Sequence, residues 1–325
     1  MSKLFKLLFF CLIFTYSDIH AQFFVKDEES TKLIQSSILG VVKEEVEDKE
    51  SKKYHKDPDL LKQYENELNT LNKYIKTVMD REWKFSQKIE YLTQEQADKI
   101  LEEKNEKYCL LKVIQVQNYK MNDFYKPGST SGFNTPQAWA YHMELVGHGH
   151  GLVIKWAGEP KKNMVASAFP IIGLSEGTIT FMIDNLQNQL HDINDKGIDR
   201  ISDLKKDVKS RAPKLKNKTL YIPKSLMADG LIKQIEKGKL DKYYQYKYKV
   251  VDNDELENAI LSKDKEVAYL SVMPAYAETF GKELYNYFIV DAEDSRFLFM
   301  TGSAVAGANG KFHHGQLMMA EKDID

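Results

Sequence analysis

The chain has 325 residues, 29% of them charged and 42% hydrophobic, and a formal net charge of −2 at pH 7. This mildly acidic balance argues against a nucleic-acid partner, because binding to phosphate backbones needs a concentrated basic surface. The two cysteines are Cys11 and Cys109, and Cys11 lies in a segment that we expect to be removed. We therefore expect no internal disulfide, so the hydrophobic core must stabilise the fold.

The first 21 residues have the order of a secretory signal peptide. Lys3 and Lys6 precede an apolar run from Leu7 to Tyr16, and cleavage is expected after Ala21. This run is too short to cross a bilayer, and no later stretch approaches the roughly 18 apolar residues that a membrane helix needs. We expect an exported protein, periplasmic or secreted, with no lipid anchor and no transmembrane segment after signal removal.

Residues 22–83 are expected to form an N-terminal helical segment. Asp57 is a capping residue, Pro58 takes the first helical position, and apolar residues then recur at spacings of three and four, which predicts one buried stripe. The stripe consists of Leu61, Tyr64, Leu68, Leu71, Ile75 and Val78. The preceding stretch, 31–49, also has apolar residues at helical spacing but contains Gly40, so it predicts a weaker helix.

An internal repeat organises the rest of the chain. Residues 92–114 align without a gap to residues 251–273. Each copy begins with a capping-box pattern that predicts a short helix. A strand with apolar residues on both faces follows each helix, as in the centre of a sheet. The capping pairs are Thr93 with Gln96 and Asp252 with Glu255.

The alignment continues through a hairpin in each copy. AYHMELV at 140–146 is matched to LYNYFIV at 284–290, and GLVIKWAG at 151–158 is matched to SRFLFMTG at 295–302. The turn GHGHG in the first copy then lies opposite DAEDS in the second. The first copy also carries an insertion rich in Gly, Pro, Ser and Asn at 119–137, which predicts a surface loop.

These patterns predict an α/β fold of the mixed α+β kind, with two related helix-strand-helix-three-strand modules whose mixed sheets pack against helices. The N-terminal helical segment precedes them. We expect the first module at 84–172, connecting helices at 173–213, and the second module at 214–303. A Gly-containing tail at 304–325 is expected to be a loop.

Histidines provide the strongest candidates for metal ligands. His148 and His150 are two residues apart, and alternate residues of a strand point to the same side. A zinc site needs three or four ligands, and the further candidates are His142, Glu144, His313 and His314. The competing interpretation is a plain hairpin turn, because glycines suit turns and DAEDS holds no histidine. HExxH and paired CxxC motifs are absent from the sequence, so we expect no cofactor, with zinc as the alternative.

No set of catalytic residues is recognisable in the sequence. Cys109 alternates with Leu111 and Val113 on a central strand, and a buried thiol is inert because only the thiolate reacts. Ser175 is better placed as a helix N-cap than as a nucleophile. No GxSxG elbow and no phosphate-binding glycine loop occurs. The catalytic residues stay unknown, and these absences weaken the case for an enzyme without excluding it.

A tyrosine-rich strand is expected at 243–251, where Tyr244, Tyr246 and Tyr248 alternate with polar residues. One interpretation is a strip that binds a glycan or a peptide, since tyrosine combines flat apolar area with a hydroxyl group. The other is a strand whose tyrosines cover a helix as part of the core. The core interpretation is favoured.

The segment KNKTLYIPKS, residues 216–225, together with the N-terminal signal, resembles uncharacterised exported bacterial proteins of unknown function. The resemblance implies a periplasmic or secreted location and brings no functional residues. We expect a non-catalytic binding or assembly component of the cell envelope or secreted space, whose partner is an envelope protein or a glycan. The alternatives are a metal-binding protein or metal-dependent hydrolase that uses His148 and His150, and glycan or peptidoglycan binding through the tyrosine strand.

Overall fold

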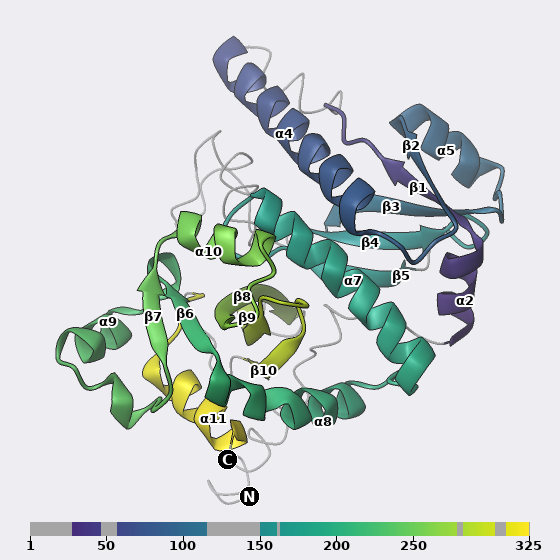
Figure 1. Ribbon diagram of the computed structural model, residues 1–325. Coiled ribbons are helices and arrows are strands. Elements are labelled where there is room, and N and C mark those ends of the chain that lie inside the picture. The colour runs from purple at the N-terminus through teal and green to yellow at the C-terminus, as the bar shows by residue number, and fades with distance from the viewer. Residues whose placement is uncertain are drawn as a thin grey trace, which may run out of the picture.

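The computed structural model describes residues 28–46, 57–115, 150–160, 163–277, 282–302 and 310–324. The expected signal peptide lies outside these ranges, as do His142, Glu144 and His148. Within them the chain forms eight α-helices and two five-stranded mixed sheets (Figure 1). The expected mixed α+β class is confirmed.

The first sheet has the strand order β2-β1-β3-β4-β5. Parallel pairing joins β1 to β2 and β3, whereas β3 with β4 and β4 with β5 are antiparallel. Helix α2 (Glu28–Ser36) precedes β1, α4 (Pro58–Glu82) connects β1 to β2, and α5 (Gln94–Glu102) connects β2 to β3. The strands are β1 (Ile38–Val42), β2 (Lys88–Leu92), β3 (Tyr108–Gln115), β4 (His150–Trp156) and β5 (Asn163–Ala168).

The second sheet, read from its other edge, has the matching order β7-β6-β8-β9-β10. Its strands are β6 (Thr219–Pro223), β7 (Tyr248–Val251), β8 (Val267–Ala277), β9 (Lys282–Asp291) and β10 (Phe297–Gly302). Helices α7 (Glu176–Lys196) and α8 (Ile201–Arg211) join the two sheets. Helix α9 (Asp229–Glu236) connects β6 to β7, α10 (Asn253–Leu261) connects β7 to β8, and α11 (His314–Ile324) follows β10.

The two modules follow one plan throughout. In both, the first strand pairs in parallel with the second and third, and the last three strands are antiparallel. The register also agrees, because Ile38 pairs with Tyr108 as Thr219 pairs with Val267. Even the turns before the third strands match, since Lys104 and Lys263 both have positive φ, 49° and 51°. The gapless alignment of 92–114 with 251–273 is therefore confirmed.

Beyond residue 114 the predicted alignment is wrong. Trp156 of β4 pairs with Cys109 in the register in which Asp291 of β9 pairs with Ala268, so β4 is the counterpart of β9 and β5 that of β10. DAEDS thus corresponds to the turn after Trp156 rather than to GHGHG. The error arose because short alternating strands match one another in several registers. AYHMELV lies outside the described residues.

Two elements differ from their predicted structure. The stretch 31–49, predicted as a weak helix, contains most of α2 and then strand β1, so the first sheet draws an inner strand from the segment expected to be helical. A Cβ at Gly40 would lie 2.5 Å from a methyl group of Leu92, so a larger residue in this strand would require that side chain to shift. The tail predicted as a loop contains α11, whose Leu317, Ala320 and Ile324 are buried at helical spacing.

Helix α7 lies between the two sheets and joins them into one core (Figure 1). The first sheet contributes Cys109 and Leu152 to this core, and the second contributes Tyr269 and Phe288. The other face of the second sheet packs against α9 and α11 in a separate core. Cys109 and Ala268 occupy equivalent positions, and Cys109 lies in the core with α7 whereas Ala268 lies in the core with α11. Helices α7 and α11 therefore cover equivalent faces of their modules. The second sheet packs against α7 with its opposite face.

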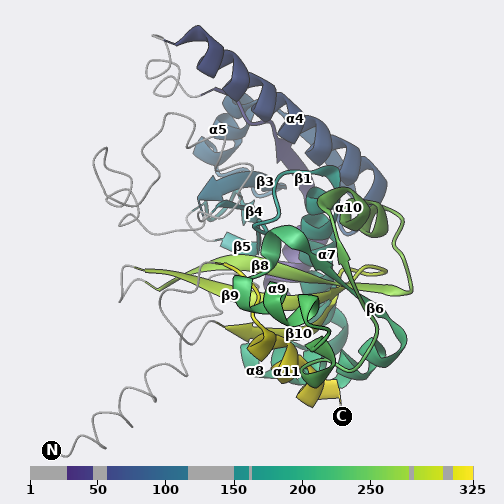
Figure 2. The ribbon, with the colours of Figure 1, turned by 90° about the vertical axis from the view of Figure 1, so that its left-hand side faces the viewer.

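Strands β8 and β9 continue past the second sheet as a two-stranded ribbon. The outer partner β6 pairs with β8 only from Val267 to Tyr269, and β10 pairs with β9 only as far as Asn286. The pairs from Pro274 with Tyr285 to Ala277 with Lys282 connect β8 and β9 alone among the strands that the structure describes. Figure 2 shows the ribbon projecting away from the helices.

Candidate functional site

Of the histidines predicted as metal ligands, the structure describes His150, His313 and His314, and these lie in different modules. His150 opens β4 opposite Gln115 of β3. His313 and His314 lie at the beginning of α11 in the other module. Across the ranges that the structure describes, no group of three or more His, Cys, Asp or Glu side chains is arranged to hold a metal ion.

The position of His150 nevertheless changes how GHGHG is interpreted. Its counterpart in the second module is Tyr285, which lies on the β8–β9 ribbon. The histidine segment therefore belongs to the connection between the third and fourth strands of its module. GHGHG was interpreted as a plain hairpin turn because it was aligned with the tight DAEDS turn, and the register of the strands shows that the two segments are not equivalent.

Cys109 lies in the core, with none of its surface exposed. Burial raises the pKa of its thiol to about 11, and a hydrogen bond with Ser37 only partly opposes this shift. At neutral pH the side chain therefore stays a thiol, which is neither a nucleophile nor a ready metal ligand. This agrees with the expectation from its place on a central strand.

The tyrosine strand is shorter than predicted, because β7 begins at Tyr248. Tyr244 precedes it and is fully buried, where it packs edge-on against Tyr246 with ring centroids 5.7 Å apart. Tyr246 and Tyr248 pack partly against the same core. The core interpretation therefore holds for Tyr244, and a binding strip would be reduced to the other two tyrosines.

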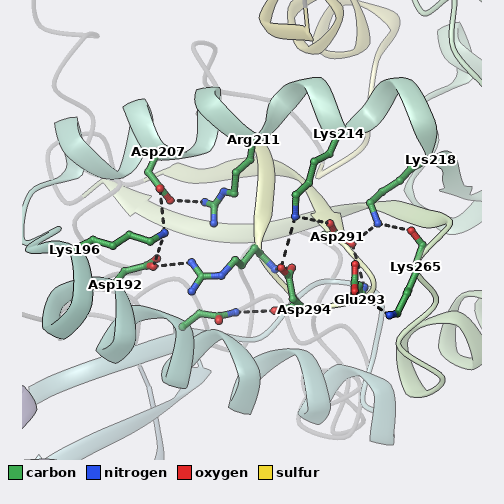
Figure 3. A network of polar contacts seen from close by, with 12 residues as sticks. Asp192, Lys196, Asp207, Arg211, Lys214, Lys218, Lys265, Asp291, Glu293 and Asp294 are labelled. Atoms are coloured by element: carbon green, nitrogen blue, oxygen red, sulfur yellow. Dashed lines mark hydrogen bonds and ion pairs between the residues drawn. The ribbon is translucent and has the colours of Figure 1, made fainter.

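A dense group of charged side chains lies where α7, α8 and the β9–β10 turn meet (Figure 3). Asp192 accepts from Arg296 at 2.6 Å and contacts Lys196 at 3.1 Å. Lys196 also contacts Asp207 at 3.1 Å, and Asp207 in turn binds Arg211 at 2.9 Å. Burial lowers the pKa of Arg211, although Asp207 opposes this. The chain of alternating charges ties α7 and α8 to the second sheet.

Asp291 forms the centre of the second half of this group (Figure 3). Its carboxylate is fully buried and lies 2.8 Å from the Lys218 ammonium, which also donates to the Lys265 carbonyl at 2.5 Å. The Glu293 backbone N–H donates to the same carboxylate at 3.1 Å, and Lys214 lies 3.6 Å away. A buried carboxylate is costly unless paired and hydrogen-bonded. Oδ1 meets both conditions, whereas the buried Oδ2 has no hydrogen bond and only Lys214 at 3.6 Å.

A second cluster lies at the junction of the modules. Lys263, from the turn after α10, binds Glu82 of α4 at 2.8 Å and Asp184 of α7 at 3.3 Å. Ser295 donates to Asp184 at 3.1 Å. Burial raises the pKa of Asp184, with Lys263 opposing. Burial also acts to raise the pKa of Glu82, but hydrogen bonds from Lys263 and Arg81 outweigh it and the pKa is lowered.

The polar contacts of α7 with the second module follow one stripe of the helix. Asp184, Asn188 and Asp192 recur every four residues, which places them on one face. Asn188 donates to the Asp294 carbonyl at 2.8 Å, between the contacts of Asp184 with Lys263 and of Asp192 with Arg296. The stripe fixes the second module along α7.

Both clusters are built to hold elements together, because their charges are paired with one another. Sequence reasoning missed them, since each joins residues about a hundred positions apart in the chain. The one available signal was the spacing of Asp184, Asn188 and Asp192 along α7, which places two acidic residues and an amide on one face of the helix.

Comparison with known proteins gives no relative: no family model, no curated protein and no solved structure matches the chain. Among the helices within the described ranges, none combines the length and apolarity that a membrane crossing requires. A function must therefore be inferred from the geometry of the chain itself.

Proposed function

We propose that the protein is an exported, non-catalytic binding or assembly component of the cell envelope or secreted space. The β8–β9 ribbon carries the proposal. Its outer pairs, from Pro274 with Tyr285 to Ala277 with Lys282, have no third strand beside them among the described residues. Open strand edges offer backbone N–H and C=O groups to a partner strand, a recurring mode of protein recognition.

The base of the ribbon is firmly anchored, which supports a docking role for its outer part. Tyr287, Phe288 and Ile289 of β9 have no exposed surface, and the following Asp291 is held by Lys218. Anchoring of the strands reduces the conformational entropy that is lost on binding, because the docking edge is already extended before the partner binds. The paired charges of both polar clusters fit the same scaffold role.

A site-specific photo-crosslinker tests this proposal. Placed at Lys282 of the ribbon and expressed in the producing organism, it should give one adduct of defined mass, because the partner strand would lie beside β9. The matched control places the crosslinker at Lys99 of α5, whose side chain is 75% exposed, and should give no such adduct. Adducts of the same masses from both positions, or none from Lys282, would contradict the proposal.

The export part of the proposal is supported by the charged, apolar and cleavage-region order of residues 1–21. Protein isolated from the producing organism should begin at Gln22 and appear in the envelope or the medium. An intact N-terminus in the cytosolic fraction would contradict export while leaving the ribbon proposal open to its own test.

The metal alternative keeps one observation in its favour, which is that His150 lies at the connection between β3 and β4 and not in a tight turn. The binding proposal expects purified protein without zinc and with a Tm that added zinc leaves unchanged. Bound zinc that is lost in His148→Ala but kept in His191→Ala, an exposed histidine on α7, would favour the metal alternative instead.

A further inference from the structure

Helix α11 exposes two methionines that nothing in the fold requires at the surface. Among the residues that the structure describes, the exposed large apolar side chains are Tyr91, Met318 and Met319. Tyr91 has polar partners, since its hydroxyl binds Asp80 and the Lys76 ammonium lies 4.1 Å from its ring centroid. Met318 and Met319 are 41% and 47% exposed. They follow two histidines in the sequence HHGQLMM.

One histidine and one methionine of this segment share a face of α11. His314 is the first residue of the helix and Met318 lies four positions later, so their side chains are neighbours on the helix surface. Met319 lies a further 100° or so around the helix. His313 precedes the helix, and its backbone N–H donates to the Gln316 side chain at 2.8 Å. The pair to consider is therefore His314 with Met318.

The imidazole of His314 is held in place with an uncommitted nitrogen. Its ring packs against Tyr243, with centroids 4.5 Å apart and planes tilted by 44°. Its Nδ1 atom is shielded from solvent and has no hydrogen-bond partner. In the neutral tautomer with the proton on Nε2, Nδ1 carries a lone pair. An ion held between the ring and the Met318 thioether would give this nitrogen the partner that it lacks.

We propose that His314 and Met318 form a binding site for a soft monovalent metal ion, Cu(I) or its redox-silent analogue Ag(I). Thioether sulfur is a soft ligand that selects such ions, and imidazole also suits copper. A zinc ion would need three or four ligands, commonly including thiolate or carboxylate. The partial positive charge of a helix N-terminus opposes any cation, so the two-ligand site binds reversibly and more weakly than a closed one. The proposal does not rest on the binding function of the ribbon.

The experiment is a titration of the full chain, labelled with ¹³C at the methionine methyl groups, with Ag(I) in chloride-free buffer. Resonances are assigned with Met318→Leu and Met319→Leu, which keep apolar bulk at each position. The methyl signal of Met318 should shift and saturate, whereas that of Met319 should move far less. This readout is specific to single residues, so silver taken up by cysteine does not obscure it.

Variants separate a built site from general thioether binding. His314→Asn should weaken the Ag(I) response of Met318 at least about tenfold, the lower bound of what even second-shell changes cost a metal site. His313→Asn and Met319→Leu should leave it unchanged. A Met318 response that survives His314→Asn, or no response at all, overturns the proposal. So does self-association that Met318→Leu alters while Ag(I) leaves the Met318 signal of the wild type unchanged, which would make α11 a protein-docking surface.

Discussion

The two modules solve one structural problem with different chemistry. Trp156 and Asp291 occupy equivalent positions, each paired with the second residue of the third strand of its module. In the first module the Trp156 indole donates to the Glu106 carbonyl at 3.1 Å. In the second, the equivalent carbonyl, of Lys265, accepts from Lys218, which also pairs with Asp291. The same backbone carbonyl therefore accepts a side-chain hydrogen bond in both modules, from an indole in the first and from an ammonium group in the second.

The difference follows from what surrounds each position. Trp156 is partly exposed, so a large ring with one polar atom serves it well. Asp291 is fully buried next to Lys214 of the helical turn η3 (Ala212–Asn217). The ion pair of Asp291 with Lys218 links β9 to the residue that ends η3, whereas the indole links two neighbouring segments of the first module. A buried pair adds little net stability but penalises strongly the loss of either partner.

The largest expected effect comes from breaking this ion pair on one side. Lys218→Met leaves the Asp291 carboxylate buried with the Glu293 N–H and the more distant Lys214, so unfolding should need about 3 kcal/mol less free energy. Urea denaturation measures the loss. Lys249→Met is the control, because its ion pair with Glu255 lies at the surface, with 53% of the lysine side chain and 35% of the glutamate side chain exposed. It should cost much less than Lys218→Met. Equal losses in the two variants would contradict the account.

The corresponding change in the first module should be milder. Trp156→Phe keeps most of the ring but leaves the Glu106 carbonyl without its indole donor, which should cost about 1 kcal/mol of unfolding free energy. Water can reach this partly exposed site and replace the bond in part. A loss of unfolding free energy as large as that of Lys218→Met would contradict the inference that the buried ion pair is more sensitive to substitution than the partly exposed indole hydrogen bond.

The junction between the modules should respond to acid with a defined sign. The lowered pKa of Glu82 means that its contribution to stability is present above its ordinary pKa of 4.5 and is lost as pH falls through the lower folded value. The raised pKa of Asp184 acts oppositely, because the folded state holds that proton more tightly and gains stability as pH falls. Lys263 pairs with both carboxylates when they are charged.

Lys263→Met isolates this contribution. More than a third of the lysine side chain is exposed, so the loss at pH 7 should be only about 1 kcal/mol. The difference between the wild type and the variant should shrink as Glu82 and Asp184 become protonated. Urea denaturation at a series of pH values from 7 to 3 measures it. A difference that is constant across this range would show that the variant acts through packing alone.

The smallest expected effect concerns the tyrosines. Tyr246→Ala should leave retention on insoluble cell-wall material unchanged, because Tyr244 beside it is buried and the strip is incomplete. The pull-down compares the variant with the wild type at equal concentration. Retention by the wild type that disappears in the variant would restore glycan binding as the better function.

Several elements were predictable because their signals are local. The cap at Asp57, confirmed by its bond from the Leu60 N–H at 3.2 Å, and the apolar stripe of α4 lie within one continuous segment. The capping box predicted at Thr93 is present. At Asp252 only the side-chain cap of the predicted box is present, and the Glu255 side chain pairs with Lys249 instead. Helices α7 and α8, separated at Gly197 with its left-handed φ of 64°, also follow from local residues.

The remainder depended on distant contacts that no local pattern encodes. Strand β1 is five residues long and has apolar residues at spacings that a helix also uses, so its pairing with β2 and β3 decides its structure. The correspondence of β4 with β9 is visible only in the register with the third strands. The polar clusters likewise form only once α7 lies against the second module.

The central claim is that two modules with one topology share a hydrophobic core around α7. Differential scanning calorimetry tests it most directly, because α7 packs against both sheets. The account predicts one cooperative transition whose calorimetric and van't Hoff enthalpies agree. Two resolved transitions, with Lys218→Met shifting only one of them, would show that the modules unfold independently and would contradict it.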